Sequence, residues 1–260
     1  MDNIVSLISE IKSGVVLVSF YQGQEKIASG SAFLCKNKII SNNHVFHPPE
    51  GNFQSDTAVV LKTNDSEFRF EYSKLSEYVI SGSAENYFDY ITLDIRSDEF
   101  SKSKFNFELG AHDDVEVGQK ILIMGYPFEH GNLTSHVGHV SAKYLKDDVN
   151  VIQLDASVNN GNSGGPVVDL NTKKVVGIVT RKATGLVKQF DDLIKSFDTN
   201  VEVLKKITGL SFGTLTLGDL LSISQNQMKV IAINIKRSAN VGIGYAFSCD
   251  KLQEEDFYKN

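Results

Sequence analysis

The sequence predicts an all-β protein, built as a barrel or a sandwich, with a partly helical stretch near its C-terminal end. Apolar runs of strand length recur along most of the chain, and turn-forming clusters such as residues 22–24 and 62–65 separate them. A helical pattern replaces these runs only after Thr180. Many short strands divided by turns are typical of barrels and sandwiches.

The expected strands are short runs rich in β-branched and aromatic residues. They cover residues 15–20, 31–34, 38–41, 58–61, 68–72, 90–95, 120–125, 137–144, 149–154, 164–168 and 174–180. Ahead of them, Ile4, Ile8 and Ile11 share one helical face, which predicts a short amphipathic helix within residues 1–12.

The region after Thr180 follows a helical period. Apolar residues that share one face there are Leu186, Phe190, Leu193, Ile194 and Phe197, followed by Val201, Leu204 and Ile207. We expect this helical stretch to end around Gly209 and strands to return at residues 230–235 and 241–247. The chain is therefore expected to be a β protein with a partly helical insertion at residues 181–237.

Composition and charge narrow the classes of partner. The chain has 260 residues, a mass of 28.7 kDa and a net charge of −6, without a long Lys/Arg run. A basic footprint for nucleic acid is therefore not expected. The apolar runs fall well short of the ~20 residues that a membrane-spanning helix needs, so no membrane partner is expected either.

Two features concern the cellular compartment. Residues 1–5 lack the basic and apolar regions of a signal peptide, which favours a cytoplasmic protein. A mature secreted chain whose leader has been removed stays an alternative. Cys35 and Cys249 are the two cysteines, and both are expected to stay thiols, with Cys35 buried in a strand.

Residues 159–166 carry the clearest chemical signal. Ser163 lies between glycines that permit a tight turn and a close approach of substrate to the backbone. A nucleophilic serine needs an exposed hydroxyl and N–H groups aimed at the developing oxyanion, which Gly161 and Ser163 would supply. The alternative for this motif alone is a glycine-rich hairpin turn with a surface serine.

The order of residues decides between two serine hydrolase classes. The histidines are His44, His47, His112, His130, His136 and His139, and all of them precede Ser163. An α/β-hydrolase places its histidine after the serine, so that class is excluded. The order His, Asp, Ser, which chymotrypsin-type serine hydrolases have, remains possible.

His44 is the best candidate for the general base, because it follows an apolar strand at a short polar turn in residues 38–45. His47 precedes Pro48 and is expected on the surface, and the other histidines are expected in loops or on strand surfaces. The pairs His44/His47 and His136/His139 have neither cysteines nor an acidic third ligand nearby, so no metal site is expected.

Several segments together resemble the HtrA-type serine proteases. Residues 41–45 resemble the histidine motif of that family, residues 30–34 its preceding Gly-Ser-Gly-Phe strand, residues 115–128 its V-x-V-G-D stretch, residues 153–158 the segment before its serine, and residues 241–247 its closing strand. The resemblance covers roughly residues 14–180 and 238–250.

The same resemblance points to the acid. The family has its aspartate at the start of a D-[LI]-A-[VL]-L-K-[VI] strand, and residues 89–95 fit this frame with Asp89 first. A triad acid must be buried and must orient the histidine. Asp94 is the second choice, at a position where the family has a solvent-facing lysine.

The resemblance implies two antiparallel six-stranded barrels with the active site between them. Residues 1–108 would form the first barrel, with His44 and Asp89, and residues 109–260 the second, with Ser163. The reaction would be peptide-bond hydrolysis of a protein or peptide through an acyl-enzyme, without a cofactor. A catalytically inactive binding module and a non-peptidase esterase are the alternatives.

Residues beside the serine bear on specificity and control. Ser157 stands where proteases selective for Lys or Arg have an aspartate, so we expect cleavage after small or medium apolar residues. Substrate contacts are expected from Ser157, Val158, Asn160, Val179 and Thr180. Asn162 cannot form the ion pair with a new N-terminus that activates digestive zymogens, so control is expected to be conformational.

Two departures from the family remain. Its usual C-terminal peptide-binding (PDZ) domain is not expected, because the chain ends soon after the last strand. Residues 181–237 replace a much shorter loop, and they are either an inert elaboration or a lid or docking element for a regulatory protein.

Overall fold

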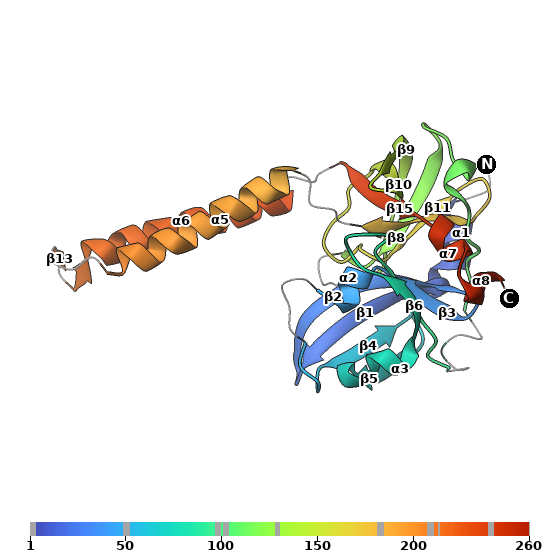
Figure 1. Cartoon of the computed structure of the whole chain (residues 1–260), viewed down its shortest axis with the longest axis horizontal. Coiled ribbons are helices and arrows are strands. Elements are labelled where there is room, and N and C mark those ends of the chain that lie inside the picture. Colours follow the sequence, from blue (N-terminus) through green and yellow to red (C-terminus); the bar gives the residue numbers. More distant parts are fainter. Residues whose placement is uncertain are drawn as a thin grey trace. The chain divides into compact units, whose positions relative to one another are not determined.

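The computed structural model describes residues 4–48, 53–96, 100, 104–127, 131–180, 185–206, 211–212, 214–238 and 242–259. The chain forms two compact units (Figure 1). The first comprises Met1–Arg181 and Gly242–Asn260, and the second is Lys182–Val241.

The first unit contains two antiparallel sheets. The N-terminal sheet has the strand order β5-β4-β1-β2-β3-β7-β6. Its strands are β1 (Val15–Gln22), β2 (Glu25–Cys35), β3 (Lys38–Ser41), β4 (Ala58–Lys62), β5 (Glu67–Glu71), β6 (Val79–Ser83) and β7 (Tyr90–Leu93).

The second sheet is a closed barrel with the order β10-β15-β12-β11-β8-β9. Its strands are β8 (Lys120–Gly125), β9 (Thr134–Lys146), β10 (Val149–Asp155), β11 (Pro166–Asp169), β12 (Val175–Thr180) and β15 (Gly244–Ser248). The last strand, β15, pairs with both β10 and β12 and so closes the ring.

Short helices accompany the sheets. They are α1 (Ile4–Ile11), α2 (Asn43–Phe46), α3 (Leu75–Tyr78), α7 (Asp250–Gln253) and α8 (Asp256–Lys259), with 3-10 turns at Lys12–Gly14, Tyr72–Lys74 and His112–Asp114. Among the described residues, no helix is both long and apolar enough to cross a membrane.

Burial of apolar side chains fixes how the two sheets meet. One core cluster contains Ile11 of α1 and Phe33 of β2 together with Leu122 of β8 and Leu252 of α7. Each sheet has in addition a core of its own. Burying apolar surface is the main driving force of folding, so the shared cluster holds the two sheets against each other.

The predicted fold class is confirmed: the structure is mostly β, with a closed six-stranded barrel and a second curved sheet. The expectation of six strands in the N-terminal sheet was one strand short. The additional strand, β6 (Val79–Ser83), is short, rich in serine and glycine, and lies at the sheet edge with a bulge beside β7. Such a segment lacks the apolar alternation by which a strand is recognised.

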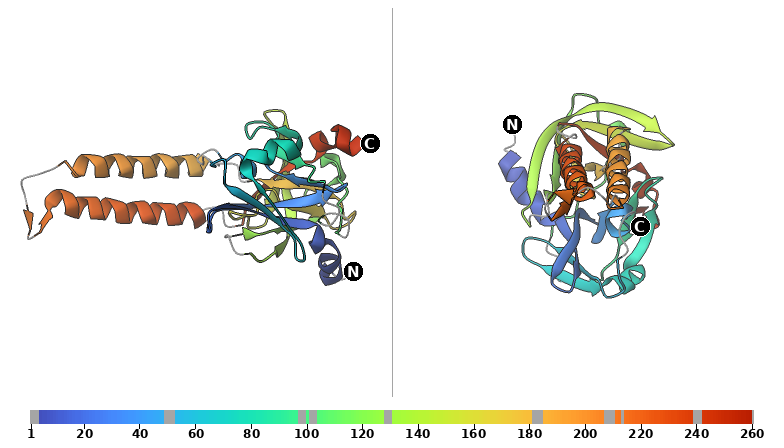
Figure 2. Two further views of the ribbon diagram at one scale, coloured as in Figure 1. Left: turned by 90° about the horizontal axis from the view of Figure 1, so that it is seen from below. Right: turned by 90° about the vertical axis from the view of Figure 1, so that its left-hand side faces the viewer.

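The second unit is a helical hairpin. Helix α5 (Gly185–Leu204) and helix α6 (Leu217–Ser238) lie side by side, and the short strands β13 (Ser211–Phe212) and β14 (Leu215–Thr216) pair between them (Figure 2). The strand predicted at residues 230–235 is therefore wrong, because α6 contains it. Its alternating Val and Ile residues favour a strand locally, but the packing of α6 on α5 outweighs that propensity. The end predicted near Gly209 lies outside the described residues.

Both cysteines are free thiols, as predicted, and neither is exposed to solvent, although burial was predicted only for Cys35. Burial raises the pKa of the Cys35 thiol from 9.0 to about 12, and it raises the pKa of Cys249 as well. A buried thiol favours its protonated form, because the thiolate would lose its hydration.

We therefore expect neither thiol to react with a disulfide reagent such as dithionitrobenzoate in the native protein at neutral pH, and both to react after unfolding. Cys35 stabilises the fold fully below pH 9, and this contribution is lost as the pH rises towards 12, since the unfolded thiol ionises first. Rapid labelling of the native protein at neutral pH would contradict the buried placement.

Candidate active site

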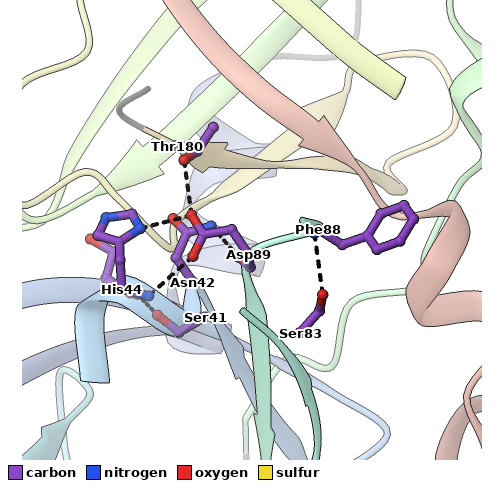
Figure 3. A network of polar contacts seen from close by, with 8 residues as sticks. Ser41, Asn42, His44, Ser83, Phe88, Asp89 and Thr180 are labelled. Atoms are coloured by element: carbon purple, nitrogen blue, oxygen red, sulfur yellow. Dashed lines mark hydrogen bonds and ion pairs between the residues drawn. The ribbon is translucent and has the colours of Figure 1, made fainter. Parts of the chain in front are cut away.

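His44 lies on the one-turn helix α2, directly after β3. Val45 and Phe46 of this helix are buried, which anchors the turn, whereas 18% of the His44 side chain is exposed. The Nδ1 atom of His44 lies 2.7 Å from Oδ2 of Asp89, and the backbone N–H of His44 donates to Oδ1 at 3.0 Å (Figure 3). Both carboxylate oxygens of Asp89 thus contact His44 and fix its ring and its backbone.

Asp89 immediately precedes the fully buried strand β7, and its side chain is 1% exposed. Its φ is +47°, a left-handed conformation that aspartate tolerates better than most residues. The Asn42 amide donates to the Asp89 carbonyl at 2.8 Å, and the Thr180 hydroxyl donates to Oδ2 at 3.1 Å. The bonds from His44 and Thr180 compensate the carboxylate for the water that it loses on burial, whereas the Asn42 bond holds the backbone of Asp89.

Ser163 lies in a tight turn that two glycines make possible. Gly161 and Gly164 have φ values of +95° and +85°. A Cβ atom at Gly161 would lie 2.2 Å from the carbonyl oxygen of Tyr126, and one at Gly164 would lie 2.0 Å from that of Ser31. No other residue fits these positions without a shift of the backbone.

The turn leaves two N–H groups available. The N–H of Asn162 donates to Asn159 O at 3.0 Å, and that of Gly164 donates to Val179 O at 2.9 Å. Within the described part of the chain, the N–H groups of Gly161 and Ser163 donate no hydrogen bond. These two groups were the predicted oxyanion donors.

Ser31 of β2 makes a set of hydrogen bonds that motif reasoning missed. Its N–H donates to Ser163 O at 2.8 Å, and its hydroxyl donates to Gly161 O at 2.6 Å. The same hydroxyl accepts from the N–H of Tyr126 at 2.9 Å, while the Ser41 hydroxyl donates to Ser31 O at 2.7 Å. Ser31 thereby orients the peptide groups on both sides of Ser163.

Gly30 brings α2 and the serine turn close together. A Cβ atom there would lie 2.6 Å from Cγ1 of Val45 and 3.4 Å from Ser163 O. Among the hydrogen bonds of the described residues, none joins Nε2 of His44 to the Ser163 hydroxyl. Catalytic hydrogen bonds are often long in ligand-free structures and tighten only when substrate is bound.

The five residues predicted to contact substrate differ in burial and in hydrogen bonding. The Ser157 hydroxyl accepts from the N–H of Gly242 at 3.2 Å, Val158 is buried in the barrel core, and Asn160 is exposed. Val179 is fully buried. Thr180 is also buried, and its hydroxyl contacts Asp89, a contact that was not anticipated.

The competing candidates lie elsewhere. Asp94 forms an ion pair with Lys38 at 2.9 Å, and no hydrogen bond of the described residues joins it to His44. His47 is exposed, and His139 lies on the exposed side of β9. His130 falls outside the described residues. Within the described ranges, no group of three His, Cys, Asp or Glu residues could hold a metal ion.

Asn162 is fully buried, and neither atom of its side-chain amide has a hydrogen-bond partner in the described structure. Its Oδ1 lies close to Gly125, where an added Cβ atom would be 2.9 Å away. Because this side chain is neutral, it cannot form the ion pair with a new N-terminus by which digestive zymogens are activated.

The paired His44 and Asp89, the serine turn and the two-sheet fold define a serine protease type of site. The chain belongs to the trypsin-like peptidase domain family, whose model matches residues 29–178.

Individual relatives agree with the HtrA resemblance. Over 82 residues the chain is 43% identical to the probable periplasmic serine endoprotease DegP-like of Rickettsia prowazekii, covering 28% of this chain and 15% of that protein. Over 84 residues it is 37% identical to serine protease HTRA4 of Homo sapiens, covering 29% and 17%. The chain thus matches less than a fifth of the length of these relatives.

The solved structure of the serine endoprotease from Yersinia pestis shares the fold. Its TM-score is 0.56 at 18% identity, and the match covers all of this chain (100%) and 68% of that one.

Replacing Ser31 by Ala should lower kcat about tenfold to a hundredfold and leave KM nearly unchanged. The Gly161 carbonyl would lose its donor and the buried Tyr126 N–H its acceptor, which typically costs about 1–3 kcal/mol. Ser19→Ala is the matched control, because the buried Ser19 hydroxyl of β1 has no partner in the described structure. Unchanged kcat in the Ser31 variant would contradict the role of Ser31.

Replacing Thr180 by Val should lower kcat/KM about tenfold, because the Asp89 carboxylate would lose a charge-assisted hydrogen bond. Thr92→Val provides the control, since the Thr92 hydroxyl on β7 is equally buried but lacks a partner among the described residues. Steady-state kinetics of the two variants decide, and equal activity of both would argue against this contact.

Proposed function

We propose that the protein is a serine endopeptidase in which Ser163 is the nucleophile, His44 the general base and Asp89 the orienting acid. The observation that carries the proposal is the two-point contact of Asp89 with His44, at 2.7 Å to Nδ1 and 3.0 Å to the backbone N–H. This contact selects the tautomer whose Nε2 accepts a proton.

The reaction follows from these roles. The Ser163 hydroxyl attacks the scissile carbonyl carbon while His44 takes its proton, and the N–H groups of Gly161 and Ser163 bind the resulting oxyanion. His44 then gives the proton to the leaving amine, which leaves an acyl-enzyme. Water, activated by His44, hydrolyses this ester and restores Ser163. The scheme needs no cofactor.

Three variants test the assignment. We expect Ser163→Ala, His44→Ala and Asp89→Asn each to lower kcat on an unstructured protein substrate, on the order of 10⁴-fold, because triad members act as a unit. Wild-type kcat in Ser163→Ala would refute the proposal. A folded wild type that cleaves neither peptides nor simple esters would support an inactive binding module instead.

We propose further that the enzyme cleaves after small or medium apolar residues. Ser157 is neutral, its hydroxyl accepts the Gly242 N–H, and Val158 packs beside Gly244, where an added Cβ atom would lie 2.5 Å from Cγ2 of Val158. A buried Lys or Arg of a substrate would find no partner at Ser157.

Cleavage of a peptide library should therefore favour apolar residues before the scissile bond. Ser157→Asp should raise the relative rate after Lys and Arg, because the new carboxylate would pair with the cation. Ser157→Asn, which adds similar volume without charge, is the control. Wild-type cleavage confined to Lys and Arg sites would contradict this specificity.

Two further properties belong to the proposal. The buried thiols Cys35 and Cys249 support a cytoplasmic location, where thiols stay reduced, and cell fractionation tests it. The hairpin Lys182–Val241 is proposed as the docking element for a regulatory protein, and removing it should alter activity or its control.

A further inference from the structure

Helix α6 of the hairpin has two different rows of residues at heptad spacing. The row that packs on α5 is buried or half-buried and consists of Gly218, Ser222, Gln225, Lys229 and Ala232. Two contacts show that this row faces α5. Lys229 pairs with Asp198 at 2.5 Å, and Asn200 donates to Gln225 at 3.2 Å. The inner row of α6 thus consists of small or polar residues.

Helix α5 presents an apolar row towards this polar one. The row consists of the half-buried or buried residues Phe190, Ile194, Phe197, Val201 and Leu204. Its alternating steps of four and three residues keep it on one side of the helix. The hairpin therefore uses the apolar row of α5 internally.

A second row of α6, which does not face α5, contains five of the large apolar side chains of the helix. Steps of four and three residues connect Leu217, Leu221, Ser224, Met228, Ile231 and Ile235. The exposed fractions are 41% for Leu221, 50% for Met228, 51% for Ile231 and 49% for Ile235. Each position of the inner row follows one of this row by one residue, so the two rows lie about 100° apart around the helix. The most apolar side of α6 is therefore left open.

Charge is excluded from the same side of the hairpin. The charged residues with described side chains are Asp191, Asp192, Lys195, Asp198, Glu202, Lys205, Lys206, Asp219 and Lys229. At helical spacing all of them project towards the inner or opposite sides. With α5 and α6 antiparallel, the α5 residues that flank the open row are Leu193, Ser196 and Asn200, which are uncharged.

We propose that this open row, Leu217 to Ile235, binds the same row of a second copy of the chain, with the two α6 helices antiparallel. Leu221 and Ile235 each lie one heptad from Met228, so a two-fold axis at Met228 brings each Leu221 against the partner's Ile235. A two-fold interface requires a surface that is complementary to itself. An uncharged heptad row meets this requirement without like-charge repulsion.

The apolar area of the open row is large enough to bind a second copy of the chain. The half-exposed side chains of the row, with Leu220 and Leu193, amount to roughly 450 Å² of apolar surface, the scale of a functional patch. Complete burial of this patch on two copies would remove about 900 Å² from water, the size of a small, weakly bound interface.

A lipid surface fits less well. Interfacial helices combine an apolar face with a polar face rich in Lys and Arg. On α5 the polar side carries both signs, with Asp191, Asp192, Asp198 and Glu202 beside Lys195, Lys205 and Lys206. This balance gives little attraction to anionic lipid.

The first test uses disulfide trapping in the full-length chain. A residue on the axis meets its own copy, so Met228→Cys should form a disulfide-linked species of twice 28.7 kDa under mild oxidation. Val230→Cys is the matched control, because Val230 is 56% exposed but lies off the row. Cys35 and Cys249 are buried and should not interfere. Equal trapping of both variants, or trapping of neither, would overturn the proposal.

Sedimentation equilibrium provides the second test. The wild type and Val230→Glu should be dimers, whereas Met228→Glu should be a monomer with unchanged helical circular dichroism. A wild type that is monomeric at all concentrations would overturn the proposal. If that monomer binds phosphatidylserine vesicles, the open row binds lipid instead. An oligomer that Met228→Glu does not weaken would overturn it too. Neither test depends on the protease activity.

Discussion

The hydrogen bonds between Ser31 and the turn that carries Ser163 determine the geometry of the candidate site. Ser31 belongs to the N-terminal sheet and the turn to the closed barrel, so these bonds connect the two halves of the first unit. The conformation of the turn is specified twice, by positive φ at Gly161 and Gly164 and by the Ser31 contacts. An oxyanion site works because its donors are oriented before the reaction, and Ser31 provides that orientation here.

Asp89 connects His44 to the closed barrel that carries the serine turn. It accepts from His44 and from Thr180 of β12, while Val179, the neighbour of Thr180, accepts from Gly164 in the serine turn. Two adjacent residues of β12 thus link the acid and the turn, each through one hydrogen bond. Burial makes each of these bonds stronger and each missing partner more costly. The His44 side therefore depends on the barrel as well as on its own sheet.

The sequence predicted those features of the site that depend on neighbouring residues in the chain. The glycines around Ser163, the apolar strand before His44 and the strand after Asp89 are each visible within about ten residues. Ser31 and Thr180 were not assigned their contacts, because their partners lie 130 and 91 residues away in the sequence. Residues 230–235 were misjudged since their Val and Ile residues satisfy a strand pattern, whereas the side of α6 that contacts α5 consists of small or polar residues, which give no apolar helical period.

Covalent labelling with a fluorophosphonate measures most directly whether Ser163 is an activated nucleophile. The account predicts that one probe molecule is attached per chain, that peptide mapping places it on Ser163, and that His44→Ala abolishes the labelling. Modification of a different serine, or labelling of Ser163 at the same rate in His44→Ala, would contradict the central claim.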